Sequence, residues 1–352
     1  LEGTYPGSTL CGLGGLGSFI SPWPAGTFNG EIVACTRGTF GRVEKGANVL
    51  AAGAGGYILM DNGSGVVGDA HVLPGIHVSQ ADGATLAAWI ASNPNPTGTI
   101  SGFSVDLSDA NGDIMAGFSS RGPGSAFDVL KPDVATPGVS IMAPFADPAG
   151  CTSSCGTVDN SFGFLSGTSM AAPHTAGAAA LLAAVRPDWS PHEVKSALMM
   201  TSTNASMLKE DGTTPADPFD TGAGRVDLSL AQEAGLVLDE TTANFEAADP
   251  NLGGDPKTLN VPSMQDGNCV EECSWSRTLT NHERHTIHVD TSFSGPTGLD
   301  VTVDPASLKV KSGQSGTITA VSYTHLRAHE TSDDISYAVF CVKIGGGGGG
   351  GG

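Results

Sequence analysis

The feature that most constrains the fold is an alanine-rich run near the middle of the chain. Residues 169–185 read SMAAPHTAGAAALLAAV. Alanine is the strongest helix former, so the run predicts a helix. Its small side chains suit a helix that is buried closely against a sheet. We therefore expect these residues to form an interior helix of an α/β domain.

Length and charge narrow the class of protein. The 352 residues are enough for two or three domains with at least one sizeable core. Acidic residues number 36 against 16 basic ones, which gives a formal net charge of -20. Such a surface repels nucleic acid and anionic membranes, so neither is an expected partner. The sequence also holds no apolar run long enough to cross a bilayer.

The first hundred residues read as a small α/β unit, because apolar runs of strand length alternate with helix-compatible spacing. The predicted elements are strands at 31–35 and 56–60, a helix at 42–54, and a short strand followed by a helix over 76–93. Asp82 is the candidate N-cap of the second helix. The sequence AGAGG does not indicate a nucleotide site, since no GxGxxG motif opens a helix here. We interpret His71 and His77 as surface or hydrogen-bonded histidines rather than ligands.

The middle of the chain continues the α/β pattern. DIMAGFSSRGP and DVLKPDVATPGVSIMAPF, within residues 113–145, are strand-like runs punctuated by glycine and proline. A helix then begins at SPHEVKSALMMTS, with Ser190 as the N-cap, Pro191 at the first helical position and Glu193 closing a capping box. A turn and a short apolar helix over 219–239 end this region.

From about residue 255 to residue 320 the character changes. The runs TIHVDTSF, LDVTVDP, SLKVKSG and TITAV are short, alternating and rich in β-branched residues, with turn residues between them. They predict a β-sandwich that stops before its last strand.

Residues 321–352 form a tail that we interpret as an artefact. SYTHLRAHET resembles the translation of a transposase adapter used in sequencing libraries, and ISYAVFC resembles that of a flow-cell adapter. The final glycine run is typical of what some instruments write after the signal ends. The alternative is a natural linker with a flexible glycine tail. We therefore place the end of the natural sequence near Ala320, and we expect the chain, which begins at Leu1, to be a fragment.

Six cysteines remain once Cys341 is set aside. An even number predicts disulfides and an oxidising compartment, and the expected pairs are local: Cys11 with Cys35, Cys151 with Cys155, and Cys269 with Cys273. Buried free thiols are the alternative. Zinc is a weaker interpretation, because CxxxC spacing without a matching histidine pattern is a poor metal signature.

Ser169 is the candidate catalytic residue. A hydroxyl nucleophile needs exposure, a base within hydrogen-bond reach and donors for an oxyanion. The start of a helix supplies free backbone N–H groups and a favourable dipole, and Gly167 allows a substrate close to the backbone. The alternative is that Ser169 or Thr168 only caps the helix. An α/β-hydrolase is excluded because the run Gly-Thr-Ser-Met-Ala is not a GxSxG elbow.

The motif GTSMAAPH resembles the signature around the active serine of subtilisin-like proteases. FSSRGP, KPDVATPGV and GAGRVD recur in the same order in the branch of that family with a protease-associated insert. The stretches GEIVACTRGTFGRVEKGANVLAAGAGGYILMDN and PGIHVSQADGATLAAWI resemble that insert, and the last region resembles the fibronectin-III-like domain that follows. The resemblance covers nearly all of residues 1–320.

This resemblance implies an α/β fold that combines part of a parallel-sheet catalytic domain with an α/β insert and a truncated β-sandwich. The implied domains are the protease-associated insert at 1–100, the C-terminal part of the catalytic domain at 101–240 and the sandwich at 241–320. It also implies a secreted endopeptidase that acts on protein or peptide substrates.

The implied mechanism forms an acyl-enzyme through Ser169, whose backbone N–H helps to hold the oxyanion. His174 is not the base, since it follows five residues later on the same helix and projects from a different turn. The aspartate and histidine of the triad, and the oxyanion asparagine, are expected upstream of Leu1, so the chain alone is expected to be inactive. No cofactor is required, and calcium is suggested by the family resemblance only.

Two other functions compete with this interpretation. A non-catalytic extracellular binding or adhesion protein could keep the fold and lose the triad, although the intact GTSMA motif argues against that. A free-standing protease-associated domain of receptor type does not explain the serine motif and sandwich that follow in the same chain.

Overall fold

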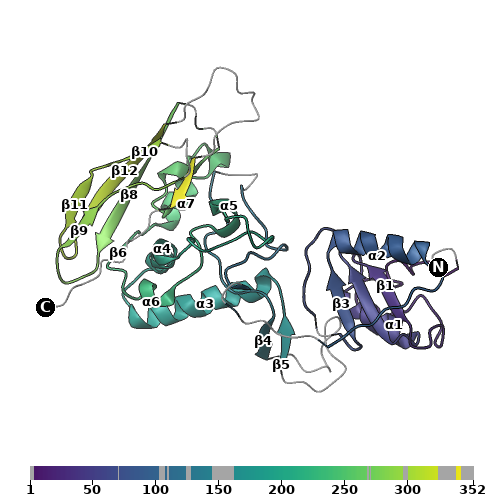
Figure 1. Ribbon diagram of the computed structural model, residues 1–352. Coiled ribbons are helices and arrows are strands. Elements are labelled where there is room, and N and C mark those ends of the chain that lie inside the picture. Colours follow the sequence, from purple (N-terminus) through teal and green to yellow (C-terminus); the bar gives the residue numbers. More distant parts are fainter. Residues whose placement is uncertain are drawn as a thin grey trace. The chain divides into compact units, whose positions relative to one another are not determined.

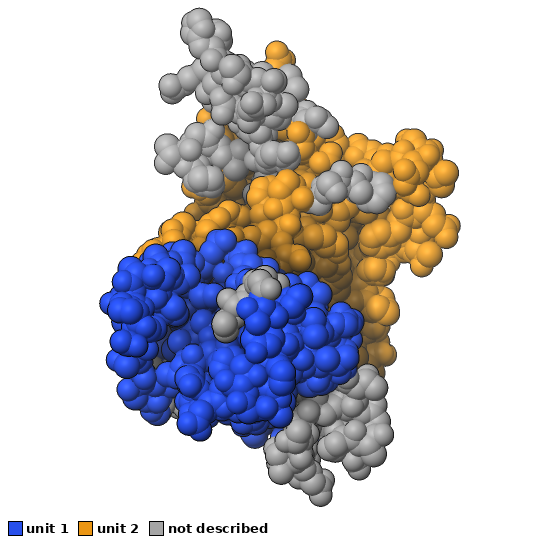
Figure 2. Space-filling model, turned by 90° about the vertical axis from the view of Figure 1, so that its right-hand side faces the viewer, with its two compact units in different colours: residues 1–112, 116–118, 137–170 blue, residues 113–115, 119–136, 171–352 orange. Residues whose placement is uncertain are grey.

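The structure is a computed structural model that describes residues 4–69, 71–102, 108, 111–123, 128–144, 162–267, 269, 271–295, 300–323 and 338–341. The chain divides into two compact units, coloured separately in Figure 2. The first unit takes residues from 1–112, 116–118 and 137–170, and the second from 113–115, 119–136 and 171–352. The α/β class predicted from the sequence is confirmed.

The first unit is built around a parallel sheet of three strands in the order β1-β2-β3 (Figure 1). The strands are β1 (Ile32–Thr36), β2 (Gly56–Met60) and β3 (Gly75–Val78), and the helices are α1 (Arg42–Ala51) and α2 (Gln80–Ser92). A side chain at Gly46 of α1 would meet Tyr57, whereas one at Gly83 of α2 would meet Met60. Tyr57 and Met60 lie on opposite faces of β2, so the two helices cover opposite faces of the sheet.

The predicted strands and helices of this unit are confirmed, but the predicted N-cap of α2 is wrong. The cap is Ser79, whose hydroxyl accepts a hydrogen bond from the Asp82 backbone N–H at 3.1 Å. Asp82 lies in the first helical turn, where its carboxylate accepts a hydrogen bond from the Ser79 hydroxyl at 2.7 Å. Serine and aspartate are both favoured at the N-cap position of a helix. Only the backbone geometry shows which of the two residues occupies it here.

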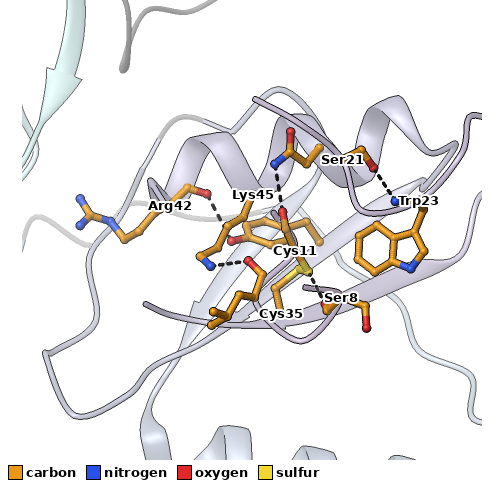
Figure 3. The surroundings of a disulfide bond; sticks show 10 residues. Ser8, Cys11, Ser21, Trp23, Cys35, Arg42 and Lys45 are labelled. Carbon is orange, nitrogen blue, oxygen red and sulfur yellow. Dashed lines mark hydrogen bonds between the residues drawn. A yellow bond between two sulfur atoms is a disulfide. The ribbon is translucent and has the colours of Figure 1, made fainter. Parts of the chain in front are cut away.

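A disulfide between Cys11 and Cys35 ties the N-terminal segment to β1, as predicted (Figure 3). Polar side chains of α1 hold the same segment through its backbone. The Lys45 amine donates to the Leu10 carbonyl, and the Asn48 amide donates to the Cys11 carbonyl at 3.0 Å. The segment therefore belongs to the core of the first unit.

The same unit holds a two-stranded antiparallel ribbon of β4 (Ile141–Pro144) and β5 (Phe162–Leu165), in which Ile141 pairs with Leu165. The other described residues of the two strand-like runs within 113–145 do not form strands, so that prediction is wrong for them. Ile114 and Ala135 each make a single parallel bridge, to Leu208 and Arg225. Prolines such as Pro132 lack the N–H that a ladder would need.

The next helices lie between residues 168 and 247, and all of their residues except 168–170 belong to the second unit. They are α3 (Thr168–Val185), α4 (Pro191–Thr201), α5 (Pro218–Thr221), α6 (Leu228–Ala231) and α7 (Thr242–Ala247). The predicted capping box of α4 is confirmed. The helix α3 exists as predicted, but it is not an interior helix: Leu182 is its one buried residue, and Leu181 is 59% exposed. It packs on one side, where Leu182 joins a core that includes Val194 and Trp189.

The C-terminal part of this unit is all β, as predicted. Short 3-10 turns η3 (Pro250–Leu252) and η4 (Pro256–Thr258) precede it. The strands are β6 (Leu236–Val237), β7 (Ser263–Asp266), β8 (Glu272–Asn281), β9 (Ile287–Asp290), β10 (Asp300–Asp304), β11 (Ser307–Val310), β12 (Ser315–Tyr323) and β13 (Ala338–Cys341). They form a sheet in the order β10-β12-β8-β6 and the pairs β11-β9 and β13-β7. The strand β12 runs past Ala320 to Tyr323.

The sandwich and the helices share a core. Met200 of α4 packs in one cluster with Leu236 of β6, Leu279 of β8 and Ile318 of β12. Since β6 pairs with β8, the main sheet begins before residue 241. The disulfide between Cys269 and Cys273 is confirmed, whereas the predicted pair of Cys151 and Cys155 lies outside the described residues.

Candidate active site

Ser169 is exposed and occupies the second position of α3. Backbone N–H groups at the start of a helix generally lack intrahelical acceptors and mark the positive end of the helix dipole. Here the Met170 N–H donates to the carbonyl of Gly167, the residue before the helix, at 2.9 Å. Pro173 lies four residues further along and has no N–H, so the Ser169 carbonyl loses its usual helical partner. The first turn of α3 therefore makes fewer internal hydrogen bonds than an ordinary helix start.

The loop over residues 135–140 supplies hydrogen bonds on either side of Ser169. The Gly167 N–H donates to the Gly138 carbonyl at 2.8 Å, and the Ser166 hydroxyl accepts from the Ser140 N–H at 2.8 Å. The Thr136 hydroxyl donates to the Ala171 carbonyl at 2.8 Å. We conclude that the KPDVATPGV motif braces the chain before and after the candidate nucleophile.

The GAGRVD motif in turn holds the start of this loop. The Ala135 N–H donates to the Gly224 carbonyl at 2.8 Å, and the Val226 N–H donates to the Ala135 carbonyl at 3.0 Å. Gly224 has a φ of +113°, and a Cβ there would lie 2.3 Å from the Thr203 carbonyl oxygen. Glycine is thus required where this turn approaches the neighbouring backbone.

Arg121 of the FSSRGP motif belongs to an ionic network in the second unit that surrounds the buried carboxylate of Asp220. Arg121 contacts Asp220 at 2.9 Å and also pairs with Glu210, while Lys209 lies 3.1 Å from Asp220. Asp220 is 1% exposed. The pKa of Arg121 is raised, first by its hydrogen bond to Glu210. The ionic contacts of Arg121 hold a loop in place. Among the described residues, this motif places no nucleophile or base beside Ser169.

A cleft of about 450 Å³ lies between α3 and α4. Its lining is mostly apolar: Asp133, Val134, Ala172, Thr175, Ala176, Ala179, Pro191, Val194, Lys195, Leu198 and Met199. Burial alone would raise the pKa of Asp133, but the ammonium groups of Lys195 and Lys131 outweigh it and lower that pKa. Ser169 does not line this cleft. The residues of α3 that do line it follow Ser169 in the helix and are mostly apolar.

The histidines singled out from the sequence fall outside this arrangement. His174 is exposed on α3. The His77 side chain is 3% exposed, and its Nδ1 lies 2.9 Å from the Val67 nitrogen, so it is hydrogen-bonded as predicted. The prediction for His71 is corrected, because its Nδ1 is buried and makes no hydrogen bond within the described residues. His71 packs edge-on against Tyr57, and burial lowers its pKa.

Neither a metal site nor a membrane span is found in the part of the chain that the structure describes. There, no three His, Cys, Asp or Glu side chains come together in a way that could hold a metal ion. No described helix is both long enough and apolar enough to span a membrane.

Sequence motifs predicted the serine and its helix but not the bracing loop. The hydroxyl of Thr136 reaches Ala171 across 35 residues of chain, and no local pattern announces such a contact. The one signal in the sequence was the loop's glycine and proline content, which indicated a turn without indicating its partner.

Comparisons with known proteins agree with these motifs. A model of the subtilase family matches residues 37–224, which is just over half of the chain. A model of the fibronectin type-III domain matches residues 258–339. The second match begins beyond the helices α3 to α7 and covers the strands from β7 to β12.

Relatives from Arabidopsis thaliana match two thirds or more of the chain. The subtilisin-like protease SBT1.6 is 40% identical over 242 residues, which cover 66% of this chain and 32% of the relative. The subtilisin-like protease SBT1.7 is 35% identical over 334 residues, which cover 84% of this chain and 43% of the relative. The chain thus spans less than half the length of these relatives. On its family match and its serine, loop and turn motifs, the chain belongs to the subtilase family.

Proposed function

We propose that the chain is part of a secreted subtilisin-like serine endopeptidase in which Ser169 is the nucleophile. The observation that carries the proposal is the exposed position of Ser169 in the first turn of α3, within the family's GTSMAAPH motif. The Ser169 N–H would donate to the oxyanion, where the helix dipole favours negative charge. The relatives are named as proteases, which supports peptide bonds as the substrate.

The reaction would be acyl transfer. Ser169 Oγ attacks the carbonyl carbon of a peptide bond while its proton passes to a histidine base, and that proton then leaves with the departing amine. Water hydrolyses the resulting ester. We place the histidine, its aspartate and the oxyanion asparagine in the part of the protease upstream of Leu1. The 352-residue chain alone is therefore expected to show no enzyme-like turnover.

The remaining assignments follow from the same proposal. Within the first unit, residues 1–100, with the three-stranded parallel sheet and two helices, would be the protease-associated insert. The two disulfides support an oxidising, extracellular destination. The apolar cleft beside α3 is open in this chain, which is consistent with a catalytic domain that needs further residues to complete its core.

The test uses the full-length protease, recovered with its upstream sequence, and a fluorophosphonate probe that labels activated serines. The matched variants are Ser169→Ala and Ser229→Ala, since both serines are exposed near a helix start. We expect labelling and peptide hydrolysis in the wild type and in Ser229→Ala, and loss of both in Ser169→Ala.

Two results would overturn the proposal in different ways. Unchanged hydrolysis in Ser169→Ala would show that another residue is the nucleophile. A wild-type protein that neither hydrolyses peptides nor takes up the probe would favour a non-catalytic binding protein with a subtilase fold.

A further inference from the structure

We propose that the chain carries two N-linked glycans, on Asn62 and Asn204. The acceptor motif is Asn-x-Ser or Asn-x-Thr, in which x is not proline. The sequence contains the motif at Asn62-Gly63-Ser64 and at Asn204-Ala205-Ser206. A third triplet, at 95–97, reads Asn-Pro-Thr and is excluded by its proline.

Asn62 lies in a loop that is held in place by the buried side chain of the residue before it. The neighbouring Asp61 is buried, and its carboxylate accepts hydrogen bonds from the Gly63 N–H at 2.8 Å and the Gly65 N–H at 3.0 Å. Arg37 lies against the same carboxylate at 2.8 Å. Because Asp61 points inward and anchors the loop, Asn62 is left exposed at its tip.

The side chains of this triplet already interact. The Ser64 hydroxyl donates to the Asn62 amide oxygen at 2.6 Å. Within the described residues the Asn62 Nδ2, which is the atom that would be modified, makes no hydrogen bond. The folded chain therefore loses no Nδ2 contact, among the described residues, when a sugar is attached there.

Asn204 is presented in a similar way after the end of α4. It opens a turn that is closed by a hydrogen bond from the Met207 N–H to the Asn204 carbonyl at 3.2 Å. Met207 is buried and anchors the turn, while Asn204 is exposed. The Ser206 hydroxyl donates to Asp113 at 2.7 Å, and the Asn204 side chain makes no hydrogen bond in the described part of the chain.

The modification joins the Asn Nδ2 to the anomeric carbon of an oligosaccharide carried on a pyrophosphate lipid. The anomeric C–O bond to the pyrophosphate breaks, the amide gives up one proton, and the lipid pyrophosphate leaves. The donor belongs to the secretory pathway, so the inference rests on the proposed secretion, which the two disulfides support. Neither asparagine belongs to a hydrophobic core, so a bulky hydrophilic glycan displaces no packed side chain.

The test is cell-free translation of the full chain with endoplasmic-reticulum microsomes. For the experiment a secretion signal is fused before Leu1 and an Asn-Gly-Thr reporter is appended after Gly352, and only molecules with a reporter glycan are scored. We expect two further glycans in the wild type. Ser64→Ala and Ser206→Ala should each remove one, and Ser64→Thr should remove none. Pro96→Ala should add one, because Asn95 is exposed and only the proline excludes it.

Mass spectrometry after enzymatic deglycosylation assigns the sites, since a glycosylated Asn is converted to Asp. Reporter-positive molecules with unconverted Asn62 and Asn204 would overturn the proposal, and one unconverted residue would overturn it for that residue. Glycans are added as the chain enters the lumen, so the number of glycans can be measured even for a variant that folds poorly. Ser169→Ala should leave the glycan number unchanged, which separates this inference from the protease proposal.

Discussion

Glu193 of α4 lies 2.6 Å from His282, which follows the last residue of β8, and this contact joins the subtilase match to the fibronectin-like match. The second oxygen of the same carboxylate accepts a hydrogen bond from the Ser190 N–H at 2.7 Å and closes the capping box of α4. The His282 ring also packs edge-on against Trp189. The largely buried carboxylate of Glu193 therefore both caps the N-terminus of α4 and links this helix to the sandwich.

A double-mutant cycle on this pair should reveal coupling between the helices and the sandwich. Glu193→Ala removes a cap and a buried partner, so we expect the free energy of unfolding to fall by about 1–3 kcal/mol. Combined with His282→Ala, the losses should be non-additive by about 1 kcal/mol. Urea unfolding measures both quantities. Glu233→Ala, an exposed acid on the same unit, is the control and should change stability by less than about 0.5 kcal/mol. Strictly additive losses would contradict the coupling.

The two disulfides should differ in how much they stabilise the chain. A crosslink restricts the unfolded chain more when the closed loop is longer, and the pairs are separated by 24 residues in Cys11–Cys35 and by 4 in Cys269–Cys273. Replacing both cysteines by alanine should cost about 3.5 kcal/mol for the first pair and about 2 kcal/mol for the second. Hydrogen exchange followed separately in β2 and in β8 measures the two losses. A larger loss for the short loop would contradict the argument.

The sequence predicted the first unit well because its pattern is local. The apolar runs at β1 and β2 are bounded by glycine, and their ends fall within a residue of the predicted ones. The wrong cap at Asp82 arose because Ser79 and Asp82 are equally good cap residues, and the hydrogen bond that separates them is absent from the sequence.

Longer-range features could not be predicted in the same way. Buried and more exposed residues alternate regularly along β8, but the buried positions include Arg277 and Asn281. Because these two residues are polar, the alternation of apolar and polar residues cannot be recognised in the sequence. Arg277 is tolerated inside because its guanidinium donates to backbone carbonyls, including that of Ser263 at 2.9 Å. The serine motif predicted the position of Ser169, but the loop that braces it comes from contacts between distant segments.

The buried amine of Lys45 should make the first unit more stable as the pH rises above about 8. Burial lowers the pKa of Lys45 from 10.5 to about 8. Between those values the unfolded chain binds more protons at this residue than the folded chain does, so the free energy of unfolding increases with pH. Burial also raises the pKa of Tyr57, which opposes the gain only above the ordinary tyrosine pKa near 10.

The measurement is hydrogen exchange of the β2 amides between about pH 8 and pH 9.5, corrected for the intrinsic exchange rate, which gives the opening free energy. Lys45→Met, which keeps the length of the side chain, should abolish the rise with pH. An exposed lysine, Lys311→Met, should leave it unchanged. A rise that persists in Lys45→Met would assign the effect to another group.

Two glycine-to-alanine substitutions in the second unit should change stability in opposite directions. At Gly224 the φ of +113° disfavours any side chain, and the new methyl would lie 2.3 Å from the Thr203 carbonyl oxygen. We expect Gly224→Ala to lower the free energy of unfolding by about 2 kcal/mol or more. Gly177 lies within α3, and a methyl group added there would meet no other side chain or segment within 4 Å, so Gly177→Ala should raise that free energy by about 0.5–1 kcal/mol.

Urea unfolding of the two variants separates backbone strain from helix propensity. Because the Gly224 turn accepts a hydrogen bond from Ala135, Gly224→Ala should also speed amide exchange at Ala135 and Val226. Gly177→Ala should slow exchange in α3 and leave those two amides unchanged. Equal effects of the two substitutions would mean that the 222–226 turn relaxes freely, and the loop that braces Ser169 would then not depend on the conformation of Gly224.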